Sequence, residues 1–127
     1  KRRALSEETA FLMTYMLRGG TEEPGGTSQA LFEFDIFWRN EIGGKTGTGD
    51  NRIATQVVRG KVMASTVNNR TATFVFYLGD NYFGTLTAFV PGKGADNFSF
   101  TSALPLQVLK GMAPILNPYI QQGQLCR

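Results

Sequence analysis

The sequence predicts an α+β fold in which an antiparallel β-sheet is covered by helices. The strongest strand segments, Arg70 to Leu78 and Tyr82 to Val90, are rich in Thr, Phe, Val and Tyr, residues that favour β-structure. The turn residues Gly79-Asp80-Asn81 join these segments as an antiparallel pair. From Thr73 onwards the first segment is apolar in both alternating phases, so both sheet faces are expected to be covered. Helical patterns near both ends of the chain would supply the cover.

The N-terminal helix is predicted to begin after Ser6, whose hydroxyl suits the N-cap position. Glu7-Glu8 would lie in its first turn, close to the positive end of the helix dipole. The stretch from Ala10 to Leu17 is apolar on nearly every side, which predicts a helix that is buried on most sides. Arg18-Gly19-Gly20 is expected to end it.

The segment before the first strand carries weaker signals. Residues 21–26 are predicted to form a polar loop, and residues 27–31 a short helix. Residues 32–38 alternate apolar and acidic side chains before they become wholly apolar, which favours an irregular segment. This segment is expected to place three side chains in the core: Phe34, Ile36 and Trp38. Residues 42–48 are predicted as a strand despite their glycines.

A β-hairpin is predicted where residues 54–58 and 61–65 flank Arg59-Gly60. Asn68-Asn69 then predicts a turn. Near the C-terminus, Ser102 is a second N-cap candidate, and apolar side chains follow it at helical spacing.

That C-terminal helix is expected to be kinked by Gly111 and Pro114. Its polar tail after Tyr119 is expected to fray.

Composition excludes several classes of function. The net charge of +3 is modest and the basic residues are scattered apart from Lys1-Arg2-Arg3, so a nucleic-acid partner is not expected. The chain has no His and a single Cys, Cys126, which excludes His-based triads and an internal disulfide and indicates neither a metal site nor a cofactor. No apolar run reaches the roughly 20 residues of a membrane-spanning helix, so any membrane anchor is expected outside this chain.

The most informative stretch is Gly43-Gly44-Lys45-Thr46-Gly47-Thr48-Gly49-Asp50, which combines an ammonium group, two hydroxyls and four glycines. Short donors on a backbone that a ligand can approach closely suit an anion. A phosphate-binding P-loop would need Gly at position 39, which is Arg39, and a helix after the Lys. A dinucleotide fingerprint would need Gly at Arg52. The remaining alternatives are the Lys-Thr-Gly element of serine acyl-transfer enzymes and a simple glycine-rich turn with a solvated Lys.

Besides the Lys-Thr-Gly element, further segments along nearly the whole chain carry a resemblance to a known family. They are Leu5-Ser6-Glu7-Glu8-Thr9-Ala10 with Met13 and Met16-Leu17, Gly25-Gly26-Thr27, Arg70-Thr71-Ala72-Thr73-Phe74-Val75-Phe76-Tyr77 and Phe100-Thr101-Ser102-Ala103-Leu104-Pro105. With them the chain resembles the transpeptidase domain of penicillin-binding proteins, and class A enzymes most. The resemblance implies the β-lactamase/transpeptidase-like fold and a peptidoglycan D,D-transpeptidase on the periplasmic face of the bacterial inner membrane, anchored outside this chain.

Two of the family's three motifs are absent from this sequence. No Ser is followed by Lys three residues later, and no Ser-x-Asn occurs. The loosely similar Thr66-Val67-Asn68 follows Lys-Thr-Gly, which is the wrong order. Residues 1–127 are therefore expected to be the C-terminal portion of one transpeptidase domain whose nucleophile half is missing. Because acyl transfer needs a nucleophile, this portion is expected to be inactive alone.

The resemblance also implies roles for individual residues. Lys45 would hold positive potential over the site and support proton movement, as a catalytic residue. Thr46 and Thr48 would bind the terminal carboxylate of a D-Ala-D-Ala stem peptide or a β-lactam, and Gly47 would leave room for the substrate backbone. The N–H of Thr48 would provide one donor of the oxyanion hole. The insertion from Asp50 to Asn69 departs from the shortest family members and would alter the rim of the site.

Two alternatives remain open. The chain could instead be a non-catalytic module or sensor that binds anions or β-lactams with the same strand, which the missing Ser motif would equally predict. The resemblance also implies that the strand Tyr82 to Val90 lacks its N-terminal neighbour. An unpaired apolar edge invites pairing with another chain, so a homodimer through this edge is expected.

Overall fold

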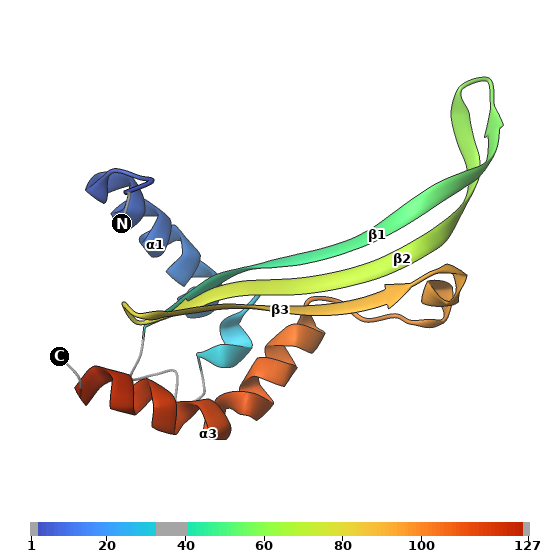
Figure 1. The fold of residues 1–127 in the computed structure, drawn as a ribbon. Helices are drawn as coiled ribbons and strands as arrows, with labels where there is room; N and C mark the ends of the chain where they lie inside the picture. Colours follow the sequence, from blue (N-terminus) through green and yellow to red (C-terminus); the bar gives the residue numbers. More distant parts are fainter. Residues whose placement is uncertain (1–2, 33–40, 126–127) are drawn as a thin grey trace.

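The computed structural model describes residues 3–32 and 41–125, and it has an α+β architecture (Figure 1). A three-stranded antiparallel sheet in the order β1-β2-β3 is combined with two α-helices, which confirms the predicted class. The helices and strands, in chain order, are α1 (Glu7–Glu22), the 3₁₀ turn η1 (Gln29–Leu31), β1 (Ile42–Val58), β2 (Lys61–Leu78), β3 (Tyr82–Pro91), the 3₁₀ turn η2 (Lys93–Asn97) and α3 (Ala103–Leu125).

Strands β1 and β2 form a hairpin that is much longer than β3. The pairing of β1 with β2 runs from Ile42 opposite Leu78 to Val58 opposite Lys61, whereas β3 ends where Pro91 pairs with Asn69. The outer part of the hairpin therefore projects beyond the rest of the sheet as a two-stranded ribbon (Figure 1).

The hairpin turn lies at Arg59-Gly60, as predicted. Both residues have positive φ, 49° and 77°, which is the geometry of the tight turns whose twist matches that of the strands. The turn predicted at Asn68-Asn69 is wrong. Asn69 pairs with Asn51 and Val67 with Arg52, so Asn68 is an extra residue in the middle of β2. The two asparagines thus mark a β-bulge, where one strand carries one residue more than its partner.

The core lies between the sheet and α3. Ile42, Phe74 and Leu78 are buried against Leu106 and Leu109 of α3, and Figure 1 shows α3 beneath one face of the sheet. The ring centroids of Phe74 and Phe76 lie 5.5 Å apart in a stacked arrangement. Burial of these side chains provides the main driving force that holds the helix on the sheet.

The opposite sheet face is largely open in the described part of the chain, so the expectation of two covered faces is wrong there. Val75, Phe83 and Phe89 remain exposed, Phe83 to 90%. The apolar phase that predicted a second helical layer belongs to this face. Helix α1 contacts the sheet mainly through its C-terminal turns, near the start of β1 (Figure 1), and Tyr77 of β2 also bonds to the carbonyl of Thr14 in the middle of the helix.

Helix α1 is N-capped by Ser6, whose Oγ accepts a hydrogen bond from the N–H of Thr9, as predicted. It does not end at Gly19-Gly20 but continues to Glu22, because this last turn packs on β1. There the hydroxyl of the buried Thr21 donates to the carbonyl of Ile42, at 2.8 Å.

The prediction that α1 is buried on most sides is also wrong. Phe11 and Met16 are more than 70% exposed, because the N-terminal turns project away from the sheet (Figure 1). The helix is apolar on nearly every side, yet the described residues provide no partner for most of that surface.

Helix α3 is bent (Figure 1), and Pro114 and Pro118 lie inside it. A proline removes a backbone hydrogen bond and displaces the preceding turn, so these two prolines account for the bend, and the expected kink within this helix is confirmed. The helix continues to Leu125, beyond the point where fraying was expected. Phe34, Ile36 and Trp38, which were predicted to lie in the core, are outside the described residues. Cys126 is outside them as well.

The outer edge of β3 pairs with no strand among the described residues, since β3 is the last strand of the sheet. Pairing of two copies of the chain through this edge stays a prediction. Light scattering over a wide concentration range would test it, and a monomeric mass throughout would contradict it.

Tyr77 makes the stability of the fold depend on pH in the alkaline range. Its phenol donates a 3.1 Å hydrogen bond to the carbonyl of Thr14, and partial burial raises the pKa of Tyr77, an effect that Arg18 partly opposes. The stability contributed by the neutral phenol is complete below the unfolded-state pKa of about 10. It is lost as the pH rises through the higher folded-state pKa, because the unfolded chain releases the proton first.

We therefore expect urea unfolding at alkaline pH to show a loss of stability that Tyr77→Phe reduces. Tyr15→Phe is the matched control, since Tyr15 is 66% exposed. An unchanged pH profile in Tyr77→Phe would show that the phenol does not couple folding to pH.

Candidate anion-binding edge of strand β1

The free edge of β1 is defined by the hydrogen bonds at its start. The carbonyl of Glu41 accepts from the N–H of Gly79, at 2.7 Å, and therefore faces β2. The next carbonyl, that of Ile42, accepts from the Thr21 hydroxyl on the other side. Backbone groups of an antiparallel strand alternate in direction along the chain, and the register is one-to-one from Ile42 to Asn51.

It follows that the N–H and C=O groups of Gly44, Thr46 and Thr48 face the outer edge of β1, away from β2. This edge pairs with no strand among the described residues. An extended ligand could therefore pair with it as an additional strand, through main-chain hydrogen bonds. The N–H of Thr48 is one of these outward donors.

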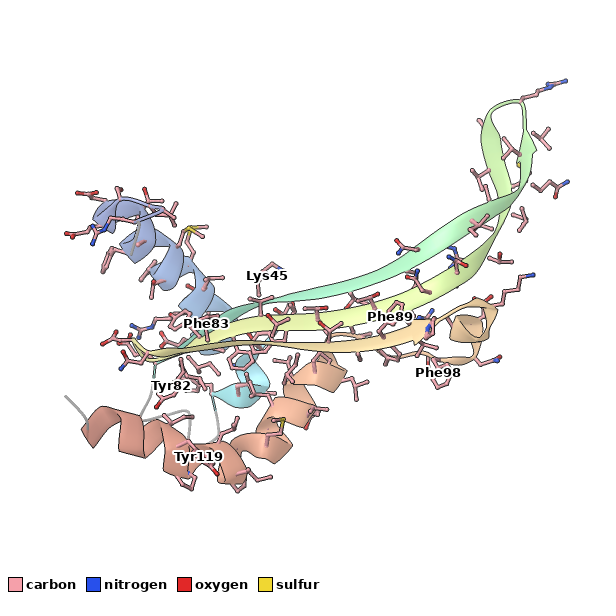
Figure 2. All side chains as sticks on the ribbon, viewed as in Figure 1. Lys45, Tyr82, Phe83, Phe89, Phe98 and Tyr119 are labelled. Carbon is pink, nitrogen blue, oxygen red and sulfur yellow. The ribbon has the colours of Figure 1, made fainter. Side chains whose placement is uncertain are left out.

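The Lys45 ammonium lies at the same edge. Lys45 pairs with Val75, and Figure 2 shows its side chain on the side of β1 opposite α3. Its Nζ donates a 2.7 Å hydrogen bond to the carbonyl of Thr46, one of the outward-facing carbonyls. The positive charge is thus held beside the outward-facing backbone groups of β1, where it favours an anion.

The hydroxyls of Thr46 and Thr48 lie on the face that α3 covers, opposite Lys45. The buried Thr46 donates a 3.1 Å hydrogen bond to the hydroxyl of Thr27. The Thr48 hydroxyl accepts a 2.9 Å hydrogen bond from the N–H of Ser102, immediately before α3. Because Ser102 only donates, the Thr48 hydroxyl keeps its own proton available for an acceptor such as a carboxylate.

Three glycines shape the strand in different ways. A Cβ on Gly43 would lie 2.5 Å from the ring of Tyr77, and one on Gly44 would lie 2.5 Å from the carbonyl of Val75. These two positions therefore need glycine for close packing within the protein. Gly47 differs, because a Cβ there would meet nothing within 4 Å. Packing within the described structure does not require a glycine at this position.

The structure brings all four predicted site residues to one stretch of edge strand, with Lys45 on one face and the hydroxyls of Thr46 and Thr48 on the other. Two residues that contact the site were not predicted as site residues. Thr27 and Ser102 were noted within segments that carry the family resemblance, and Ser102 also as an N-cap candidate, but neither was assigned to the site. The sequence holds no spacing signal for either contact, since they lie 19 and 54 residues from their partners.

The carboxylate of Asp50, at the end of the glycine-rich stretch, is paired within the hairpin. Both of its oxygens accept from the Arg70 guanidinium, at 2.9 and 3.0 Å, and Arg52 lies 3.8 Å away. A carboxylate bound in this bidentate way is largely neutralised, so it opposes an incoming anion less than a free one would.

Comparison of the sequence with protein-family models and with curated proteins finds no match. Within the described residues, no group of three or more Asp, Glu, Cys or His side chains is placed to hold a metal ion. None of the described helices is long and apolar enough to cross a membrane.

Proposed function

We propose that this chain is the C-terminal portion of a penicillin-binding transpeptidase domain and supplies its Lys-Thr-Gly strand. The observation that carries the proposal is the position of Lys45, Thr46 and Thr48 on an unpaired sheet edge, with the N–H of Thr48 directed outward. An outward N–H at this point can stabilise the negative oxygen that develops during acyl transfer, an effect worth about 3 kcal/mol per donor.

Each residue of the edge has a part in this proposal. A D-Ala-D-Ala stem peptide or a β-lactam would lie along β1, with its terminal carboxylate held by the hydroxyl of Thr48. The hydroxyl of Thr46 would join it by exchanging its hydrogen bond to Thr27 for one to the carboxylate. Lys45 would keep the site positive and assist proton movement. Gly47, which has open space beside it, would let the substrate backbone approach the strand.

The exposed apolar surface of α1 supports the view that the chain acts within a larger domain. Its five large apolar residues between positions 11 and 16 are 47% to 74% exposed, which is more than a monomeric surface helix normally leaves to water. The half that carries the Ser-x-x-Lys nucleophile would cover part of this surface. The intact enzyme would work on the periplasmic face of the bacterial inner membrane.

Intact-mass spectrometry after incubation with benzylpenicillin tests the proposal. We expect the intact protein that contains this chain to gain one penicilloyl group, and the 127-residue chain to gain none, because the latter has no activated Ser. Acylation of the chain itself would show that one of its own serines is reactive and that the motif assignment is wrong.

A matched pair of variants at Thr48 isolates the contribution of its N–H. Thr48→Val and Thr48→Pro both lose the hydroxyl, but only Thr48→Pro also loses the outward N–H, and proline is tolerated on edge strands. We expect Thr48→Pro to slow penicillin acylation of the intact protein about 100-fold more than Thr48→Val. Equal rates in the two variants would remove this N–H from the oxyanion hole.

A second candidate function is a non-catalytic anion- or β-lactam-binding module, which the absence of Ser-x-x-Lys from this sequence favours. If the intact protein is not acylated, but benzylpenicillin still shifts the amide NMR signals of Lys45 to Thr48, this function replaces the enzyme.

A further inference from the structure

The outer part of the β1–β2 hairpin is a second feature of the molecule that the proposed site does not use. We call residues 53–63 the distal arm. No third strand among the described residues pairs with it, since β3 ends opposite Asn69. From Arg52 to Val58 the ribbon extends about 23 Å past that point, at roughly 3.3 Å per residue. The turn η2 packs only at its base, where Val67 and Ala95 are buried.

The distal arm is apolar and exposed. Its large apolar side chains are between 47% and 65% exposed: Ile53, Val57, Val58, Val62 and Met63. Val57 and Val62 face each other across the two strands, next to the turn at Arg59-Gly60. These exposed apolar side chains lie at the end of the ribbon that is furthest from the core (Figure 2). They do not contribute to the core between the sheet and α3, so their presence needs another explanation.

The charges of the arm all have one sign. Residues 51–69 contain Arg52, Arg59 and Lys61 and no Asp or Glu. Arg52 bonds back to Ser65. Arg59 and Lys61, at the tip, form no ion pair with any described residue.

We propose that the distal arm binds the surface of an anionic lipid bilayer. Val57, Val58 and Val62 enter the boundary between headgroups and acyl chains, while Arg59 and Lys61 contact the lipid phosphates. Apolar side chains beside unpaired cations are the combination that interfacial membrane anchors use. A hairpin suits this environment because its strands satisfy each other's backbone hydrogen bonds and only the turn and outer edges face the lipid.

The same charges argue against dimerisation, in which the distal arm of a second copy of the chain would cover these apolar side chains. Two arms side by side would bring together cations of like sign without any acidic partner, which is unfavourable. The other exposed apolar surface, on α1, has charges of both signs, because Glu7 and Glu22 pair with Arg3 and Arg18. The variants distinguish the two surfaces, because substitutions in the arm should weaken lipid binding through the arm and leave binding through α1 unchanged. This inference does not rest on the proposed enzymatic function.

Co-sedimentation of the 127-residue chain with phosphatidylcholine vesicles, prepared with and without phosphatidylglycerol, tests the proposal. We expect binding that requires phosphatidylglycerol and weakens as salt is added. Arg59→Asn should lower the affinity about fivefold, and it preserves the turn because Asn tolerates positive φ. Val57→Thr with Val62→Thr should lower it about tenfold, and Thr keeps the β-propensity of Val.

Two controls match these variants outside the arm. Val75→Thr changes an equally exposed valine on the sheet, 52% exposed, and Lys93→Gln removes an exposed cation in η2. Neither should change the affinity. Equal binding to neutral and anionic vesicles, no binding, or equal losses in the arm and control variants would overturn the proposal. So would self-association in the absence of lipid that the arm variants abolish, because the occupant would then be a second copy.

Discussion

Lys45→Ala is expected to slow penicillin acylation of the intact protein by about 100-fold to 1,000-fold, the range seen when one preorganised electrostatic contact to the reacting group is removed. The reason is geometric, since Lys45 is the cation that lies at the outer edge of β1, with its Nζ 2.7 Å from the Thr46 carbonyl. Acylation rates measured by intact mass or with a fluorescent penicillin would show the effect.

Lys61→Ala is the matched control for this prediction. It removes the same charge from the same hairpin, but at the far end of β2, opposite Val58. We expect its acylation rate to match that of the unmodified protein. Equal losses in both variants would mean that overall charge, and not the position of Lys45, governs the reaction.

Phe74→Ala is expected to lower the free energy of unfolding by about 3–5 kcal/mol, the usual cost of truncating a fully buried Phe. Phe74 is 0% exposed, stacks on Phe76 and lies in the core against α3. Because domains are typically stable by only about 5–15 kcal/mol, this variant should be close to unfolding. Urea denaturation followed by circular dichroism measures the difference.

The neighbouring residue gives the control for this variant. Val75→Ala truncates a side chain that is 52% exposed on the open sheet face, and it should cost far less. Similar losses in the two variants would show that the open face is covered in solution, for instance by a second copy of the chain.

The sequence was most informative where a local rule decides the structure. The cap at Ser6, the hairpin turn at Arg59-Gly60 and the kink near Pro114 each follow from the stereochemistry of a few neighbouring residues. The Asn68-Asn69 pair shows the limit of such rules. Turn-forming residues also suit a β-bulge, and only the partner strand determines which of the two forms.

Long-range packing explains the other differences. Helix α1 continues through Gly19-Gly20 because its last turn packs on β1, and tertiary contacts of this kind override helix propensity. The four predicted site residues lie together because they are consecutive on one strand. Thr27 and Ser102 reach the same site from distant parts of the chain, and no pattern within one segment could have predicted those contacts.

The bulges in the β1–β2 hairpin have a consequence for how the length of this ribbon can vary. A slip of one residue in a regular sheet turns every later side chain to the opposite face, which would exchange the faces of Lys45 and Thr46. The pairing of β1 with β2 is regular only from Ile42 to Asn51 and becomes irregular at three places beyond that point. An inserted or deleted residue in the outer ribbon can be absorbed at these irregular places. The hairpin can therefore lengthen or shorten, through evolution or by design, while the orientation of Lys45 to Thr48 is preserved.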